Sequence, residues 1–408
     1  MTSKMKNCRF VLILAMVLLM PWNASAQRLN RKKAALAAQE VLKEWKNETA
    51  AQWRAVWDSR NLTIGGRTMP FHVQLFGSRP ADGYSLYISL HGGGNAPSEL
   101  NDQQWDNQKR LYRPDHAVYI APRAPYDDWD MWFKPGLDDF YRALIQMAVA
   151  FEGVNPDKVY IMGYSAGGDG VWRMAPRMAD AWAAASMMAG HPGDVRLENL
   201  RNTPFMIWCG ALDSAYNRNE EDRLRGLQMD SLQQSDPQGY VHETHIVEGK
   251  AHWMERVDTV AVAWMAQYTR NPYPEKIVWR QEEVTHPSFY WLSAPESEVR
   301  RGMTVRLERK GNVVDIEQCD YPSLTLYFND EMLNLDKPVV VRYQGQTVFK
   351  GRLSRSRSLM AATLRQRGDA RYMFSASYEF RKNSGEAFHF LITPQSPESV
   401  RVSLHPWG

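Results

Sequence analysis

The sequence has few cysteines, no long apolar run after residue 26 and no large excess of one charge. Its 408 residues include three cysteines, Cys8, Cys209 and Cys319, which lie far apart, so a disulfide framework is not expected. After residue 26, no stretch has the roughly 20 apolar residues that cross a bilayer. Lys and Arg number 49 and Asp and Glu number 46, and this near balance excludes a strongly basic surface for nucleic acid. We therefore expect no nucleic-acid partner and no stable membrane span.

Motifs for bound cofactors are also absent. The sequence has no phosphate-binding loop, no haem motif and no zinc-ligand spacing, so we expect neither a cofactor nor a metal. Asp127, Asp128 and Asp130 are clustered oxygen donors, but their segment lacks the glycine and the final glutamate of a calcium loop. We interpret these carboxylates as charge on a solvated loop.

The first 26 residues are typical of a cleaved secretory signal peptide. Lys4, Lys6 and Arg9 precede an apolar run over residues 10–20, and small residues at 24–26 supply a site for signal peptidase. The apolar run has about half the roughly 20 residues that a membrane-spanning helix requires. We therefore predict that the protein is secreted or periplasmic.

Residues 61–270 alternate between strand and helix patterns, after a helical segment over residues 27–60. Alternation of this length predicts a largely parallel sheet with helices on both faces, which is the α/β class. The expected strands are 68–76, 84–90, 117–121, 158–162, 183–188 and 204–209, with a further strand at His242 and His245, and the expected helices are 138–152, 166–179, one from Glu220, and 254–269.

The pattern changes after Pro272 and Pro274, which mark a helix end and a linker. We assign residues 271–300 to a connector and residues 301–408 to a small β-sandwich-like domain with one helix at 358–367. This domain could cap the preceding one, or it could bind carbohydrate or a partner. Its expected strands are 304–309, 313–318, 323–328, 339–343, 347–351, 372–378 and 400–404.

A serine motif stands at the junction of a predicted strand and a predicted helix. Gly163-Tyr164-Ser165-Ala166-Gly167 follows strand 158–162 and begins helix 166–179. A sharp turn there holds the serine in a strained conformation, and the flanking glycines let neighbouring segments approach closely. The five residues alone occur by chance in many sequences, whereas the strand before and the helix after them favour a functional turn. We therefore predict Ser165 as a nucleophile.

A glycine loop, His91-Gly92-Gly93-Gly94, comes directly after the predicted strand 84–90. Attack of a serine on an ester creates an oxyanion, which needs preorganised hydrogen-bond donors. We predict that these are the backbone N–H of Ala166 and the N–H of Gly93 or Gly94. His91 is interpreted as a residue that orients the loop rather than as a base.

A nucleophilic serine needs a base, and the base needs an acid that fixes its tautomer. In an α/β sheet of this kind the acid follows a late strand and the histidine precedes the last helix, which selects Asp213 and His252. Asp194 is a competing acid, and His242 and His245 are competing bases on a predicted strand.

Several aromatic residues lie near predicted loops where α/β sheets bind ligands. Trp129, Trp132 and Trp253 are candidates to contact a sugar or an aromatic acid, although tryptophans also simply pack in a core. Arg123 and Arg218 could hold a substrate carboxylate or could form ordinary ion pairs.

The glycine loop, the Gly-Tyr-Ser-Ala-Gly-Gly segment, Asp213 and His252 resemble the motifs of esterases related to polyhydroxybutyrate depolymerases, feruloyl esterases and dienelactone hydrolases, all of them α/β-hydrolases. The resemblance covers roughly residues 61–270. It implies an exported carboxylic ester hydrolase that forms an acyl-enzyme on Ser165, with a small-molecule or polysaccharide-linked ester as substrate, such as an acetyl or feruloyl ester. A serine peptidase of the prolyl-oligopeptidase type and a non-catalytic binding module on the same fold are the alternatives.

Overall fold

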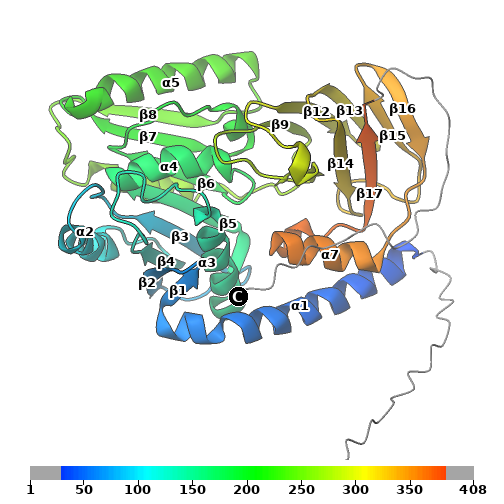
Figure 1. Ribbon diagram of the computed structural model, residues 1–408, viewed down its shortest axis with the longest axis horizontal. Coiled ribbons are helices and arrows are strands. Elements are labelled where there is room, and N and C mark those ends of the chain that lie inside the picture. The colour runs from blue at the N-terminus through cyan, green and yellow to red at the C-terminus, as the bar shows by residue number, and fades with distance from the viewer. Residues whose placement is uncertain (1–28, 383–408) are drawn as a thin grey trace, which may run out of the picture.

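The computed structural model describes residues 29–382. Within this range the chain forms a long N-terminal helix, a central sheet with helices on both faces, and two smaller sheets (Figure 1). The predicted signal peptide and the predicted strand at 400–404 lie outside the described residues. None of the helices in the described part combines the length and the apolar character that a membrane crossing needs.

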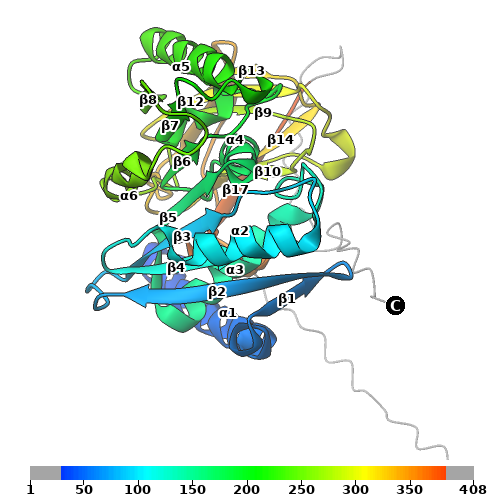
Figure 2. The ribbon, with the colours of Figure 1, turned by 90° about the vertical axis from the view of Figure 1, so that its left-hand side faces the viewer.

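The central sheet has eight strands in the order β1-β2-β4-β3-β5-β6-β7-β8. The pairs β1–β2 and β2–β4 are antiparallel, and every other neighbouring pair is parallel. Figure 2 shows the strands following one another from β1 and β2 at the bottom to β8 near the top. The predicted α/β class is confirmed for this region. The strands are β1 (Asn61–Ile64), β2 (Arg67–Phe76), β3 (Tyr84–Leu90), β4 (Ala117–Pro122), β5 (Val154–Tyr164), β6 (Ala184–Met188), β7 (Phe205–Gly210) and β8 (His242–Val247).

Strands β4, β6 and β7 are buried along their whole length, as expected for a sheet with helices on both faces. Side chains alternate along β3, so that Leu86 and Ile88 pack in the core under α3 (Leu137–Glu152) and α4 (Ala166–Arg177). Tyr87 between them joins the opposite core, which contains residues of α6 (Val260–Met265). The remaining helices of this region are α2 (Ser98–Leu111) and α5 (Arg218–Ser235).

Two helices of this region differ from the sequence expectations. The last helix, expected over 254–269, is reduced to α6 with a short 3-10 turn before it. Helix α2 was not expected, because its sequence SELNDQQWDNQKRL is almost entirely polar and has no apolar stripe.

Helix α1 (Arg31–Ser59) has 29 residues, is about 44 Å long and contacts both parts of the molecule. In Figure 1 it runs along the lower edge, from α7 (Arg357–Arg367) to the start of the central sheet. The Trp57 indole donates to Glu152 on α3 over 3.0 Å, and Glu48 pairs with Arg365 on α7 over 2.8 Å. This confirms the predicted leading helix, which contacts both α3 and α7.

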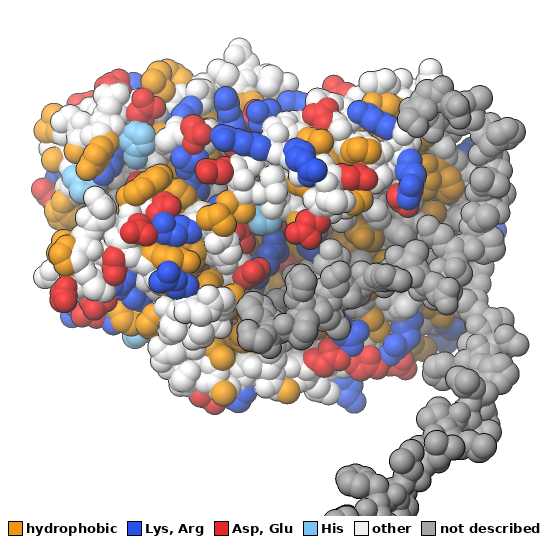
Figure 3. Space-filling view, viewed as in Figure 1, with side chains coloured by type: hydrophobic (Ala, Val, Ile, Leu, Met, Phe, Trp, Pro, Cys, Tyr) orange, Lys and Arg blue, Asp and Glu red, His pale blue; other side chains and the backbone are white. Residues whose placement is uncertain are grey.

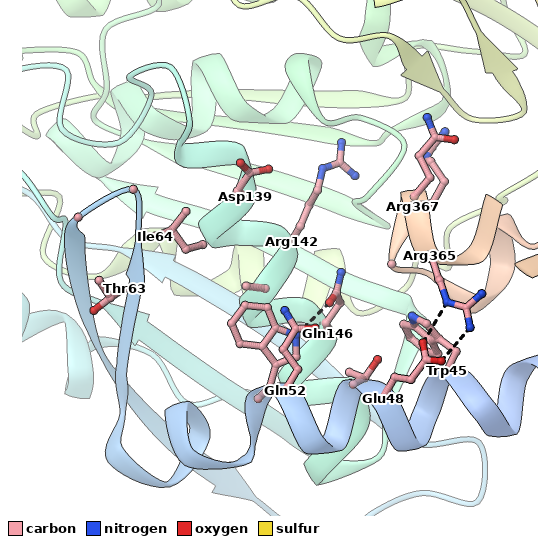
Figure 4. Close-up of a pocket in the computed structure, with 17 residues that line it drawn as sticks. Trp45, Glu48, Gln52, Thr63, Ile64, Asp139, Arg142, Gln146, Arg365 and Arg367 are labelled. Carbon is pink, nitrogen blue, oxygen red and sulfur yellow. Dashed lines mark hydrogen bonds and ion pairs between the residues drawn. The ribbon is translucent and has the colours of Figure 1, made fainter. Parts of the chain in front are cut away.

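A cavity of about 750 Å³ lies between α1, α3 and α7 (Figure 4). Glu48 and Arg365 form an ion pair at one side of it, and Gln146 accepts a hydrogen bond from the Trp53 indole. None of the predicted nucleophile, base or acid residues lines this cavity. This cavity is therefore separate from the predicted catalytic residues.

The C-terminal part consists of two sheets that share one hydrophobic cluster. Val305 and Ile316 of one sheet and Leu324 and Phe328 of the other belong to this cluster. One sheet has the order β16-β15-β13-β12-β9 and the other β10-β11-β14-β17. The strands are β9 (Lys276–Arg280), β10 (Ser288–Phe289), β11 (Leu292–Ser293), β12 (Thr304–Lys310), β13 (Val313–Cys319), β14 (Ser323–Phe328), β15 (Val339–Tyr343), β16 (Gln346–Gly351) and β17 (Ala376–Arg381).

The segment 271–300, expected to be a connector, carries three of these strands. Strand β9 pairs with β12, and its residues Ile277, Val278 and Trp279 are buried. The strand expected at 372–378 begins only at Ala376, since Tyr372 ends a short 3-10 turn. The domain boundaries stay predictions.

Candidate active site

Ser165 stands between β5 and α4, in a backbone conformation that an ordinary residue avoids. Its φ is 56° and its ψ is −122°, and such values are retained only when the surroundings enforce them. The Ser165 N–H donates to the carbonyl of Met188 over 2.9 Å. A Cβ at Gly163 would lie 2.3 Å from the Gly167 carbonyl oxygen, and one at Gly167 would lie 2.1 Å from that of Leu90. Both motif glycines are therefore required by backbone contacts.

The three residues predicted to act together form a continuous chain of contacts. Ser165 Oγ lies 2.9 Å from Nε2 of His252, and Nδ1 of His252 lies 2.7 Å from Oδ2 of Asp213. Asp213 follows β7, and His252 follows β8. The Asp213 side chain is 1% exposed and that of His252 is 42% exposed, so the acid is buried while the base is open to solvent. This arrangement can move a proton from the serine hydroxyl to the imidazole.

The loop that carries His252 is held by the residue next to the nucleophile. The Tyr164 hydroxyl donates to the His252 carbonyl and accepts the Met254 N–H over 3.1 Å. A Cβ at Gly210 would lie 2.3 Å from the Ala251 carbonyl oxygen, so a glycine is needed where β7 ends. Nothing in the sequence pointed to Tyr164, because its partners are about 90 residues away.

The competing acid and bases predicted from the sequence have other partners. Asp194 is bonded to Arg173 and Arg301. His242 contacts Asp230, and His245 stacks on Trp208 with ring centroids 4.1 Å apart. None of these three side chains contacts Ser165.

His91 is a buried residue that holds the glycine loop. Its Nε2 accepts the N–H of Ala124 over 3.1 Å, which leaves Nδ1 to donate to the Gly92 carbonyl over 2.6 Å. Burial, with the nearby charge of Arg123, lowers the pKa of His91 to about 3. A neutral imidazole with both nitrogens occupied fits the predicted role in orienting the loop.

The two glycines predicted as alternative oxyanion donors differ in their contacts. The Gly94 N–H donates to Asn101 Oδ1 over 2.8 Å. The Gly93 N–H makes no hydrogen bond within residues 29–382, and a Cβ at Gly93 would lie 2.2 Å from the same Asn101 oxygen. Gly93 and Ala166, which both line the cavity next to Ser165, are therefore the better pair of candidate donors.

A cavity of about 390 Å³ opens beside Ser165. Trp129 lines it and is 61% exposed, so its indole is open to the cavity. Trp132 is fully buried, and its indole donates to the His91 carbonyl over 2.9 Å. The prediction that Trp132 contacts substrate is therefore wrong, because this side chain packs under the glycine loop. Trp253 is exposed and lies against Tyr164, outside the lining of this cavity.

The cavity also contains residues that the sequence did not single out. Phe133 and Tyr216 add two aromatic rings, and Arg173 and Asp169 add charge. Asp169, one helical turn after the nucleophile, accepts the N–H of His191 over 2.6 Å. Burial raises the pKa of Asp169 to about 6. Asp169 and Arg173 lie on α4 after Ser165, Tyr216 comes shortly after Asp213, and Phe133 lies in the loop at 129–133. Only the fold brings these side chains together around one cavity.

The clustered aspartates on that loop are engaged in ion pairs. Asp127 bonds to Arg123 over 2.6 Å, and Lys134 bridges Asp128 and Asp130. Arg123 is thus a structural ion-pair residue rather than a ligand-binding one. Between residues 29 and 382, no group of three His, Cys, Asp or Glu side chains is arranged to hold a metal ion.

No protein-family model matches the chain. Over 156 residues, or 35% of this chain, the sequence is 28% identical to "Putative esterase NocK" of Nocardia uniformis subsp. tsuyamanensis. The match covers 45% of that protein, so the chain spans less than half the length of this curated relative.

Three solved structures are similar to the chain over about half of its length. One is described as a thermostable esterase, with a TM-score of 0.39, 17% identity, and coverage of 52% of this chain and 62% of that one. An acetyl xylan esterase from Aspergillus awamori has a TM-score of 0.35, 11% identity, and coverage of 48% and 93%. A ferulic acid esterase has a TM-score of 0.36, 17% identity, and coverage of 51% and 95%.

The resemblance to esterases drawn from the sequence is confirmed by the curated relative, which is described as a putative esterase. The predicted enzyme class, a carboxylic ester hydrolase, agrees with that description. The α/β fold of this region rests on the strand order of the central sheet.

Proposed function

We propose that this protein is an exported serine hydrolase that cleaves carboxylic esters through an acyl-enzyme on Ser165. The observation that carries the proposal is the chain of contacts from Ser165 through His252 to Asp213, with the serine at a strained turn. The sequence of residues 1–26 supports export.

In this proposal His252 is the general base and acid. Its Nε2 takes the proton of Ser165 as Oγ attacks the ester carbonyl, and then gives that proton to the departing alcohol. Water, activated by the same nitrogen, releases the acid from the acyl-enzyme. Asp213 accepts a hydrogen bond from Nδ1–H, which keeps Nε2 free and stabilises the imidazolium.

The tetrahedral intermediate carries its negative charge on the former carbonyl oxygen. We assign the N–H groups of Gly93 and Ala166 to this oxyanion. One such donor is typically worth about 10²- to 10³-fold in kcat. Because Asn101 binds the Gly94 N–H, its part is to hold the glycine loop in place.

Among esters, we favour those attached to a polysaccharide, with an acetyl or feruloyl acyl group. The support for this choice is the exposed Trp129 next to the nucleophile, which offers a stacking surface. The acetyl xylan and ferulic acid esterases among the similar structures point the same way.

Ester hydrolysis is tested with the purified protein and 4-nitrophenyl acetate. We expect release of 4-nitrophenol, and we expect Ser165→Ala to lose at least 10³-fold of this activity with an unchanged circular dichroism spectrum. Ser231→Ala, at an exposed position on α5, is the matched control and should keep full activity. Equal rates for Ser165→Ala and the wild type would overturn the serine mechanism, and cleavage of a peptide but of no ester would favour a peptidase.

A further inference from the structure

Arg218 lies beside the candidate nucleophile and has one buried hydrogen-bond donor without a partner in the described residues. It lines the cavity at Ser165, and its side chain is only 11% exposed. Its Nη1 reaches Asp213 Oδ1 at 3.3 Å, which is a long contact. Its Nε is buried and has no hydrogen-bond partner within the described residues. Asp213 cannot satisfy this guanidinium fully, because its other oxygen is bonded to His252.

Arg173 brings a second guanidinium to the same cavity. Its Nη1 bonds to Asp194 over 2.6 Å, and it lies 5.5 Å from the centre of the Phe133 ring. Asp194 is shared with Arg301, so its charge is divided between two arginines. A Cβ at Gly193 would lie 2.4 Å from Nη2 of Arg173, so the lack of a side chain there makes room for the guanidinium.

The other groups in the cavity lining make no hydrogen bond to Arg218 or Arg173. The one carboxyl in its lining, Asp169, already has one oxygen on the His191 N–H. Burial lowers the pKa of His191, so this imidazole adds no positive charge at neutral pH. The lining thus holds two guanidiniums and one carboxyl, while Asp194 and Asp213, which contact these guanidiniums, lie outside it.

A buried guanidinium with an unpaired N–H is costly unless a ligand completes its hydrogen bonds. The planar fork of Arg matches a carboxylate, which can accept two parallel hydrogen bonds. Trp129, Phe133 and Tyr216 supply aromatic surface in the same cavity for the body of such a ligand.

We propose that the natural ester carries a carboxylate in addition to the bond that is cleaved, and that Arg218 and Arg173 bind this carboxylate. This inference rests on the proposed function, since it names the substrate class of the same site. The carboxylate is unchanged in the reaction, which consumes one water and yields an acid and an alcohol. It can belong to the acyl group or to the alcohol, for example to an acidic sugar.

Two matched pairs of esters test the proposal and separate these two sources. For the acyl side, the pair is mono-(4-nitrophenyl) glutarate and its neutral terminal amide. For the alcohol side, the pair is 4-acetoxybenzoate and 4-acetoxybenzamide. We expect kcat/KM for the acid to exceed that for the amide by about tenfold or more in at least one pair, as a hydrogen-bonded ion pair allows. Ratios at or below one in both pairs would overturn the proposal.

Variants then assign the preference to the two arginines. Arg173→Gln and Arg218→Gln should each lower the acid-to-amide ratio at least fivefold, while Arg218→Lys should keep part of it. Arg223→Gln, on the same helix and paired with Glu220, is the control and should leave the ratio unchanged. If Arg218→Gln slows both members of a pair equally and Arg173→Gln changes neither ratio, Arg218 acts only through Asp213 and the proposal fails.

Binding to Ser165→Ala separates this inference from the proposed function. Calorimetry with this variant should give a lower Kd for each preferred acid than for its amide, and this readout needs no hydrolysis. Failure of the wild type to cleave any ester would refute the proposed function. Equal Kd values for acid and amide would refute the carboxylate site.

Discussion

Replacing Tyr164 with Phe should impair catalysis without touching the three reacting side chains. The change keeps the ring against Trp253 but removes the hydroxyl that binds the His252 carbonyl and the Met254 N–H. Each hydrogen bond contributes about 0.5–1.5 kcal/mol net, so the free energy of unfolding should fall by about 1–3 kcal/mol. The His252 loop then loses its tie to the nucleophile strand, and a displacement of about 1 Å costs roughly 10²-fold in rate.

We therefore expect kcat for 4-nitrophenyl acetate to fall about 10- to 100-fold in Tyr164→Phe, with urea unfolding measured in parallel. Tyr160→Phe is the matched control, because Tyr160 lies on the same strand and its hydroxyl donates to the Tyr268 carbonyl over 2.8 Å. It removes one hydrogen bond, so it should lose about 0.5–1.5 kcal/mol of stability and keep its kcat. A Tyr164→Phe enzyme that is destabilised like the control but has wild-type kcat would refute the claim that this hydroxyl positions His252.

Two further predictions concern residues in and under the cavity. Burial raises the pKa of Asp169 to about 6, above the ordinary value of an unfolded aspartate, so its ionisation opposes folding as pH rises from about 4 to 6. Asp169→Asn should therefore gain about 2–3 kcal/mol relative to wild type between pH 4 and pH 7 in urea unfolding, and a difference that does not vary with pH would contradict this. Trp132→Ala should lose about 3–5 kcal/mol of stability because its indole is fully buried. Trp129→Ala should keep its stability but raise KM for aromatic esters several-fold, and the reverse pattern would show that the two tryptophans have been assigned wrongly.

The parts of the site that could be predicted from the sequence are those set by local geometry. Ser165 was identified because a strand, two glycines and a helix surround it within a few residues. His252 and Asp213 followed from chain order, since parallel strands bring their carboxyl ends to one edge of the sheet. The glycine loop was visible for the same reason.

The rest depends on contacts between distant segments. Trp129 and Trp132 are three residues apart with the same chemistry, and only the fold shows that one is exposed and the other buried. Arg123 and Arg218 were equal candidates to hold a carboxylate, and only the fold shows that Arg123 is engaged in ion pairs while Arg218 lines the cavity. Helix α2 was not predicted because it is polar, although its Asn101 accepts the Gly94 N–H of the glycine loop. In each case the deciding partner lies in another element.

Glycines outside the five-residue motif also make close backbone contacts between segments that are distant in the sequence. A Cβ at Gly168 would lie 2.5 Å from the Met188 carbonyl oxygen, and one at Gly190 would lie 2.4 Å from the backbone of Gly168. The first turn of α4 is therefore pressed against the end of β6, whose Met188 also accepts the Ser165 N–H. A second close contact joins Gly210, at the end of β7, to the backbone of Lys250 and Ala251 in the His252 loop. The strained φ of Ser165 persists because the backbone around it has no room to relax. That rigidity keeps Oγ at hydrogen-bonding distance from His252, which the proposed chemistry requires.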